Sequence, residues 1–212
     1  MITQEQILER KNYIGGSDAA GVLNMSRWDS PISVWLRKGE NAKIENTENL
    51  ATELGNELEE VVARLFEKRT ALKTRKMNLT IYHSKHKYIA CHIDRKIEGE
   101  NAFLECKTTS QWNAKEWEGE EIPQEYIIQC LHILNCTEYD YCYIAVLIGN
   151  KEFKFKKIEK DKELQEKILN EEIYFWNEYV LKKQIPNIIT YFDKENIEKI
   201  YPKVKNIKII EV

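Results

Sequence analysis

The first half of the chain carries apolar residues at the three- and four-residue spacing that is typical of helices. The helices predicted from this spacing span residues 4–11, 19–24, 30–38 and 52–70. The residues expected to form one buried stripe on the last of these helices are Leu54, Leu58, Val61, Val62, Leu65 and Phe66. Glu59 falls beside that stripe, directly after Leu58.

The middle of the chain changes to short apolar runs that are typical of strands. The strands predicted there span residues 74–82, 89–97 and 102–108. The last two flank Glu98-Gly99-Glu100-Asn101, which has the length and composition of a hairpin turn. The elements predicted after this hairpin are a helix at 124–136, strands at 141–148 and 152–158, and a helix at 160–183 that Pro186 ends.

This order of elements predicts a mixed α/β fold in which a mixed sheet lies between helical layers. No Pro/Gly/Ser-rich linker interrupts the chain of 212 residues. We therefore expect a single domain over residues 1–185 and a tail of unassigned role at 186–212.

Composition indicates in which cellular compartment the protein works and which kinds of partner it can bind. The 32 basic and 35 acidic residues give a net charge of −3, so any contact with a polyanion must be local. One local basic run exists between Arg64 and Lys87, with eight Lys/Arg against one acid, although such a run can be simply a solvated face. The five cysteines form no CxxC pair, and no signal peptide or membrane-spanning stretch is found. These features predict a protein of the reducing cytoplasm, without a membrane segment or disulfides.

The stretch FLECKTTS at 103–110 carries an acid and a base two residues apart. Because side chains alternate along a strand, Glu105 and Lys107 are expected on one face, with Cys106 on the other. If the two strands of the hairpin pair, Asp94 comes to lie beside Glu105. Two carboxylates can bind Mg²⁺ and a lysine can orient or deprotonate a water for attack on phosphorus. Taken alone, however, this spacing also fits a surface ion pair.

Further stretches, in the same order along the chain, resemble the phage-type alkaline exonucleases, the YqaJ-like viral recombinases that are similar to the lambda exonuclease. They are RKNYIGGSDAAGVL at 10–23, LGNELEEVVARLFEKRT at 54–70, HID at 92–94, ECKTTSQWNAKEW at 105–117 and EYIIQCLHIL at 125–134. The late hairpin at 143–163 also looks like that of the family. In this chain Ile93 stands where the family usually has proline, and His92 where the lambda enzyme has serine.

The resemblance implies a restriction-endonuclease-like core of the PD-(D/E)XK type and a metal-dependent exonuclease. The catalytic residues that it implies are Asp94, Glu105, Lys107, Glu59 and Gln129. The metal ligands that it implies are Asp94, Glu105, Glu59 and the backbone carbonyl of Cys106. Mg²⁺ is the expected cofactor, with Mn²⁺ able to substitute, and the cysteine spacing disfavours an iron–sulfur cluster.

The resemblance also assigns residues that contact DNA. Arg10 and Ser17 match residues that hold a terminal five-prime phosphate, and Gly16 lies in the loop between them. Independently, two glycines followed by Ser-Asp form a helix-start signal with free backbone donors. Lys115 is the nearest basic candidate after the ExK strand.

The activity implied is five-prime to three-prime degradation of double-stranded DNA, which leaves three-prime tails for recombination. The resemblance implies a homotrimer and a single-strand annealing protein as partner. It also implies a phage- or prophage-type protein that acts in the cytoplasm of a bacterial host. Two alternatives stay open: a structure-specific DNA endonuclease with the same site, and a non-catalytic DNA-binding module on a nuclease fold. The complete set of acids and lysine argues against the second.

Overall fold

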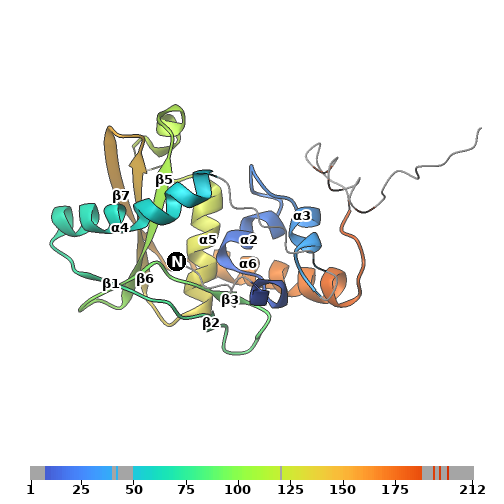
Figure 1. Cartoon of the computed structure of the whole chain (residues 1–212). Helices are drawn as coiled ribbons and strands as arrows, with labels where there is room; N and C mark the ends of the chain where they lie inside the picture. The colour runs from blue at the N-terminus through green and yellow to red at the C-terminus, as the bar shows by residue number, and fades with distance from the viewer. Residues whose placement is uncertain are drawn as a thin grey trace, which may run out of the picture.

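A mixed five-stranded sheet forms the centre of the computed structural model, which describes residues 8–39, 42, 50–119, 121–187, 193, 196 and 200. Its strands are β1 (Thr74–Lys76), β4 (Arg95–Ile97), β5 (Ala102–Thr109), β6 (Tyr141–Ile148) and β7 (Glu152–Glu159), adjacent in that order (Figure 1). The central pair β5 and β6 is parallel, and the other pairs are antiparallel. The predicted mixed α/β fold is confirmed.

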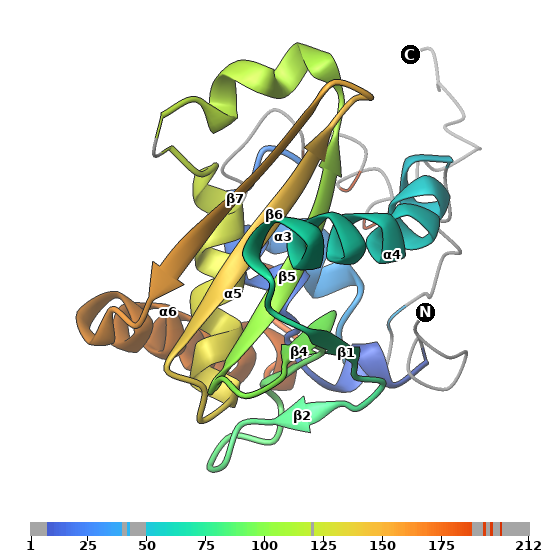
Figure 2. The same ribbon diagram turned by 90° about the vertical axis from the view of Figure 1, so that its left-hand side faces the viewer.

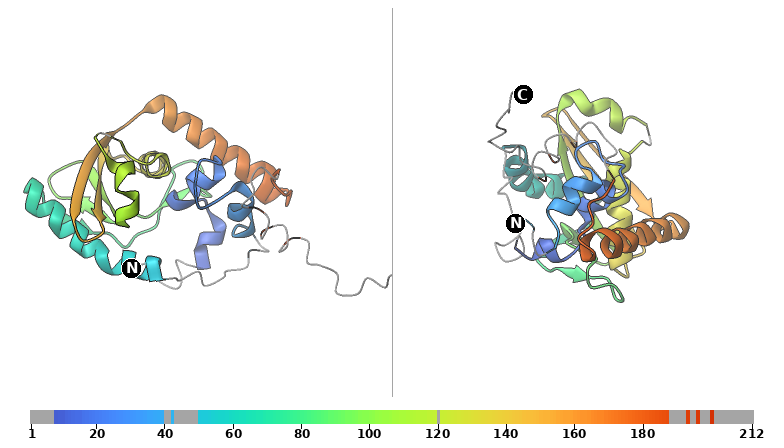
Figure 3. Two further views of the ribbon diagram at one scale, coloured as in Figure 1. Left: turned by 90° about the horizontal axis from the view of Figure 1, so that it is seen from above. Right: turned by 90° about the vertical axis from the view of Figure 1, so that its right-hand side faces the viewer.

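Helices cover both faces of this sheet. On one face α4 (Leu50–Thr70) crosses the strands, and on the other lies α5 (Gln124–Cys136) (Figure 2). Beyond α5 lie α2 (Gly16–Val22), α3 (Pro31–Leu36) and α6 (Lys162–Phe175) (Figure 3). The 3-10 segments are η1 (Arg10–Asn12) and η2 (Gln111–Trp117). No described helix has the length and apolar character needed to cross a membrane.

The alternation of side chains along β5 separates the two layers of the core. Phe103 packs in a cluster that includes Ile128 and Leu131 of α5. Leu104 packs in another cluster, with Val62 and Phe66 of α4. Burial of apolar side chains on both faces therefore stabilises the first half of β5, and the polar site is built on the second half.

Two of the predicted strands are interrupted. The range 74–82 contains β1 and the separate β2 (Ile81–Tyr82), and the range 89–97 contains β3 (Ala90–Cys91) and β4. The strands β2 and β3 pair with each other in a second, two-stranded sheet. The chain changes sheet at residues 92–94, where the Asp94 carboxylate, rather than a backbone carbonyl, accepts the Cys106 N–H.

The stripe predicted on α4 is buried only in part. Val62 and Phe66 are fully buried, whereas Leu54 is 47% and Val61 41% exposed. Figure 2 shows that the start of α4 extends beyond the strands, so Leu54 near that end has no sheet to pack against. Val61 lies in the middle of the helix and is turned away from the sheet that buries its neighbour Val62. The prediction of one continuous buried stripe was therefore wrong for these two residues.

Other boundaries agree closely with the sequence pattern. The predicted helix at 124–136 and strand at 141–148 are present with those bounds, and the hairpin turn at 98–101 joins β4 to β5. The last helix ends its α-helical part at Phe175 and continues as a π-helical segment, η3 (Trp176–Leu181). Residues 4–7 of the first predicted helix and most of the tail at 186–212 lie outside the described residues.

Candidate active site

The side chains of Glu105 and Lys107 extend from the same face of β5, toward α5. Both contact Gln129 of α5, whereas Cys106 between them packs with the cluster under α4. The shared face predicted from strand alternation is confirmed. The parallel neighbour β6 fixes this register over the whole length of β5.

Glu105, Lys107 and Gln129 form a closed triangle of hydrogen bonds. Lys107 Nζ donates to Glu105 Oε1 at 2.7 Å and to Gln129 Oε1 at 3.0 Å. Gln129 Nε2 in turn donates to the same Glu105 oxygen at 2.7 Å. The triangle is sheltered, because Glu105 is 3% exposed and the Lys107 side chain 19%. These charge-assisted bonds hold one oxygen of Glu105 and the lysine ammonium in fixed positions.

Asp94 lies beside this triangle. The last backbone pair between β4 and β5 joins Arg95 to Leu104, so the next positions along the two strands are Asp94 and Glu105. Asp94 Oδ2 accepts the backbone N–H of Cys106 at 2.7 Å. Burial, and then the charge of Glu105, raise the pKa of Asp94 to about 8. Two carboxylates thus share a poorly hydrated space in which both are charged only if further positive charge is added.

The Lys107 ammonium already offsets part of the negative charge of these two acids. Burial alone lowers the pKa of Lys107, but the carboxylates of Glu105 and Asp94 outweigh it, and the pKa lies above its ordinary value. The lysine therefore remains protonated at neutral pH. In this arrangement it can orient a water molecule or stabilise negative charge, but it cannot accept a proton.

The oxygen donors at Asp94 and Glu105 suit a hard divalent cation. Among the described residues, no group of three or more His, Cys, Asp or Glu side chains is arranged to hold a metal ion. Mg²⁺ does not need such a group, because it commonly binds through one or two carboxylates and keeps several waters. The raised pKa of Asp94, which burial and the Glu105 charge cause, marks the place where a cation would be most stabilising.

Glu59 extends from α4 toward the same edge of the sheet but has other partners. Its Oε1 accepts a hydrogen bond from Arg95 Nη2 at 2.8 Å and lies 3.5 Å from Lys76 Nζ. After burial and Glu105, the Glu59 charge also contributes to the raised pKa of Asp94. No contact among the described residues joins Glu59 to Asp94 or Glu105. The sequence identified Glu59 but gave no sign of Arg95, because the pair is 36 positions apart.

The predicted phosphate-contacting residues also lie together. Arg10 Nη2 donates to Ser17 Oγ at 2.6 Å. The loop before Ser17 is held by Asp18, which accepts the Gly15 N–H at 2.9 Å and the Lys38 ammonium at 2.6 Å. Asp18 is 2% and Lys38 6% exposed. The sequence analysis missed this buried ion pair; the Asp that follows Gly-Gly-Ser was its only local signal.

Gly16 brings that loop against the acid cluster. A Cβ atom at Gly16 would lie 3.3 Å from Cγ of Gln129 and 3.4 Å from Cγ1 of Ile133. A side chain at this position would make Gln129 shift by a few tenths of an ångström, so the close approach of α2 to α5 favours glycine here. The candidate phosphate loop and the triangle at Glu105 are thus neighbours through Gln129.

Lys115 is not joined to these groups. It is exposed on η2, and no described contact connects its side chain with the acids or with Arg10. The assignment of Lys115 as a DNA-contacting residue therefore remains a prediction from the sequence, which no described contact supports.

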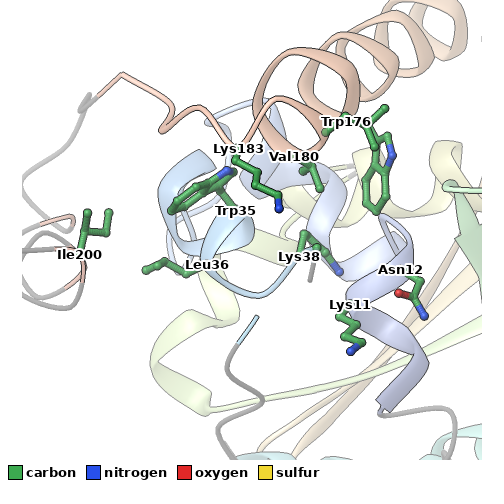
Figure 4. A pocket seen from close by; sticks show the side chains of 11 residues that line it. Lys11, Asn12, Trp35, Leu36, Lys38, Trp176, Val180, Lys183 and Ile200 are labelled. Atoms are coloured by element: carbon green, nitrogen blue, oxygen red, sulfur yellow. The ribbon is translucent and has the colours of Figure 1, made fainter. Parts of the chain in front are cut away.

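A hollow near the N-terminal 3-10 segment is also separate from the acids. It encloses about 500 Å³ between η1, α3 and η3, and its lining includes Trp35, Lys38, Trp176 and Val180 (Figure 4). None of the acids at the candidate site lines it. We locate the candidate chemistry at the polar cluster of Asp94, Glu105, Lys107 and Gln129, because the site is defined by its reactive groups and not by the volume of a cavity.

Comparison with known proteins gives a consistent result. Residues 7–140 match the YqaJ-like viral recombinase domain. The chain is 40% identical over 215 residues to the uncharacterized protein YqaJ of Bacillus subtilis (strain 168), covering 100% of this chain and 67% of that protein. The fold is similar to that of an alkaline exonuclease, LHK-Exo, from Laribacter hongkongensis, with a TM-score of 0.68, 19% identity and coverage of 93% and 100% of the two chains. A phage-related exonuclease from Haemophilus somnus 129PT matches with a TM-score of 0.55, 15% identity and coverage of 82% and 96%.

Proposed function

This chain belongs to the YqaJ-like viral recombinase family, and we propose that it is a metal-dependent exonuclease that degrades double-stranded DNA. The observation that carries the proposal is the cluster of Asp94, Glu105, Lys107 and Gln129 on the core strand and its covering helix. An ion pair on an ordinary surface has no reason to be sheltered, cross-linked by a glutamine and placed beside a second carboxylate.

Asp94, Glu105 and the backbone carbonyl of Cys106 would hold Mg²⁺, for which Mn²⁺ can substitute. When bound, the cation supplies the positive charge that offsets charge developing on the phosphate and makes water a better nucleophile. Lys107, fixed by Glu105 and Gln129, points its ammonium at the attacking water or at a phosphate oxygen. Gln129 holds the side chains of Lys107 and Glu105 in position, and Glu59 provides a further carboxylate from α4.

The test uses linear duplex labelled at its ends and a covalently closed circle, each with Mg²⁺ or with EDTA. We expect release of mononucleotides from the linear DNA with Mg²⁺ only, and an intact circle. Cleavage of the circle would instead favour a structure-specific endonuclease. DNA binding without cleavage of either substrate would favour a non-catalytic DNA-binding module.

The five-prime to three-prime direction is proposed from Arg10 and Ser17. Phosphodiester chemistry has no inherent direction, so polarity requires a second anchor at a fixed distance from the reacting bond. Arg10 offers a permanently charged fork and Ser17 a hydroxyl, and the two are already in contact at 2.6 Å.

A duplex with five-prime phosphates should therefore be degraded faster than the same duplex with five-prime hydroxyls. Arg10→Ala should remove most of this preference, whereas Lys11→Ala, which deletes the same charge one residue away, should keep it. A preference that persists in Arg10→Ala would assign the polarity to another part of the protein.

The proposed context is DNA recombination in the cytoplasm of a bacterial cell. There the enzyme would act as a homotrimer around the duplex and pass three-prime tails to a single-strand annealing protein. Light scattering on the purified protein tests the homotrimer, since a measured mass of one chain, 25.2 kDa, would contradict it.

A further inference from the structure

Arg95, the residue directly after Asp94, is buried on the side of the sheet that faces α4. It is 6% exposed and pairs across the ladder with Leu104, whose side chain packs under α4. Its Nη2 donates to Glu59 Oε1 at 2.8 Å and to Glu60 Oε2 at 3.0 Å. One guanidinium nitrogen thus binds two consecutive acids of the helix.

Only one of the two carboxylate oxygens of Glu59 is bound by these cations. Both Arg95 and Lys76 approach Oε1, and within the described part of the chain no hydrogen bond or ion pair engages Oε2. Lys76 stands directly opposite Arg95 on β1, so two cations face each other across the strands. Like charges in that position repel, and the Glu59 carboxylate between them relieves the repulsion. Glu59 is therefore fixed in one orientation, with its second oxygen left for another ligand.

Arg95 is poorly explained as a purely structural residue. Its Nε is buried and has no hydrogen-bond partner among the described residues. An unsatisfied buried donor destabilises the fold, and an apolar side chain would avoid that penalty. The arrangement is understandable if the orientation of Glu59, rather than the stability of the fold, requires the guanidinium.

We propose that Arg95 is a positioning residue that holds Glu59 by one oxygen and leaves the other oxygen available to a cation held by Asp94 and Glu105. This inference rests on the proposed function, in which Asp94 and Glu105 bind a divalent cation. It assigns Arg95 no contact with substrate. Partners of this kind, which orient a metal-ligating carboxylate, typically change metal affinity by about 10- to 100-fold when they are removed.

The two possible effects of Arg95 have opposite signs, which makes the inference testable. If Arg95 were only a positive charge near the site, its removal would strengthen cation binding, because repulsion would fall. If it positions Glu59, its removal weakens binding. Glu60 provides a matched control, since it contacts the same Nη2 but is exposed to solvent.

The experiment is calorimetric titration of the DNA-free protein with Mn²⁺. Arg95→Met should weaken binding by about 10- to 100-fold, and Glu60→Gln should change it by less than about threefold. In a Glu59→Gln background, Arg95→Met should have almost no further effect, because its target is gone. Arg95→Lys, which keeps the charge but loses the planar fork, should also weaken binding, and it replaces Arg95→Met if that variant is unfolded at the assay temperature.

Unchanged or tighter Mn²⁺ binding by a folded Arg95 variant would overturn the positioning role while leaving the metal site intact. The positioning role would also be overturned if Arg95→Met lowered Mn²⁺ affinity equally in the wild-type and Glu59→Gln backgrounds. If the wild-type protein bound no Mn²⁺, the proposed metal site would fail, and this inference with it.

Discussion

The buried pair of His132 and Glu172 should make the stability of the protein fall as the pH rises. Its two side chains are both 0% exposed and join α5 to α6. His132 Nδ1 donates to Glu172 Oε1 at 2.6 Å, and Nε2 donates to the backbone carbonyl of Ala90 at 3.0 Å. Both ring nitrogens therefore act as donors, which requires the protonated imidazolium.

The size of the effect follows from the pKa of His132. Burial alone lowers it, but the Glu172 carboxylate and its hydrogen bond outweigh burial and raise the pKa from 6.5 to about 9. A folded-state pKa above the unfolded value stabilises the protein fully below about pH 6.5, and that stabilisation is lost as the pH rises through 9. A difference of this size corresponds to a loss of about 3 kcal/mol between these limits.

Urea unfolding at intervals from pH 6 to pH 10 measures this loss. The double variant His132→Leu/Glu172→Leu removes both charges together, so no buried charge is left alone. Between pH 6 and pH 10 the unfolding free energy of the wild type should fall by about 3 kcal/mol relative to that of the double variant. A difference that stays constant with pH would refute the charged pair.

Three further predictions concern the candidate site and its support. Lys107→Met should slow cleavage by about a hundred- to a thousandfold without weakening Mn²⁺ binding, because the lysine stabilises charge and holds no metal; near-normal rates would make it a surface ion-pair partner. Gly16→Ala should displace Gln129 by a few tenths of an ångström and slow cleavage by about tenfold in single-turnover assays; an unchanged rate would show that this contact is unimportant. Gly21→Ala would place a Cβ 2.8 Å from Cγ2 of Val34 and should destabilise the fold by about 1–3 kcal/mol in urea titration, which an unchanged midpoint would contradict.

Features that depend on local periodicity could be predicted from the sequence. The common face of Glu105 and Lys107 follows from the two-residue repeat of a strand, and the helix that carries Gln129 follows from its apolar spacing. The loop with Gly16 was identified by its glycines, although the close approach of Gly16 to Gln129 is a property of the packed helices.

Features that depend on which elements become neighbours could not be predicted. The bonds from Arg95 to Glu59 and from Lys38 to Asp18 connect positions 36 and 20 residues apart, and no local pattern marks either pair. The break between β3 and β4 was missed for a related reason. A side-chain carboxylate, that of Asp94, ends the backbone ladder there, whereas strand propensity describes only the backbone and its apolar positions.

The proposed activity depends on Asp94, directly before β4, and on Glu105 of β5, and one comparison tests them most directly. It measures the rate of nucleotide release from linear duplex DNA with Mg²⁺ by wild type, Asp94→Asn and Glu105→Gln, with the exposed Lys160→Ala as a surface control. We expect each acid variant to lose more than about a hundredfold in rate, since removal of even the outer partners of metal ligands costs about 10- to 100-fold, while the control stays close to wild type. Acid variants that fold normally and degrade DNA at nearly the wild-type rate would contradict the proposed active site.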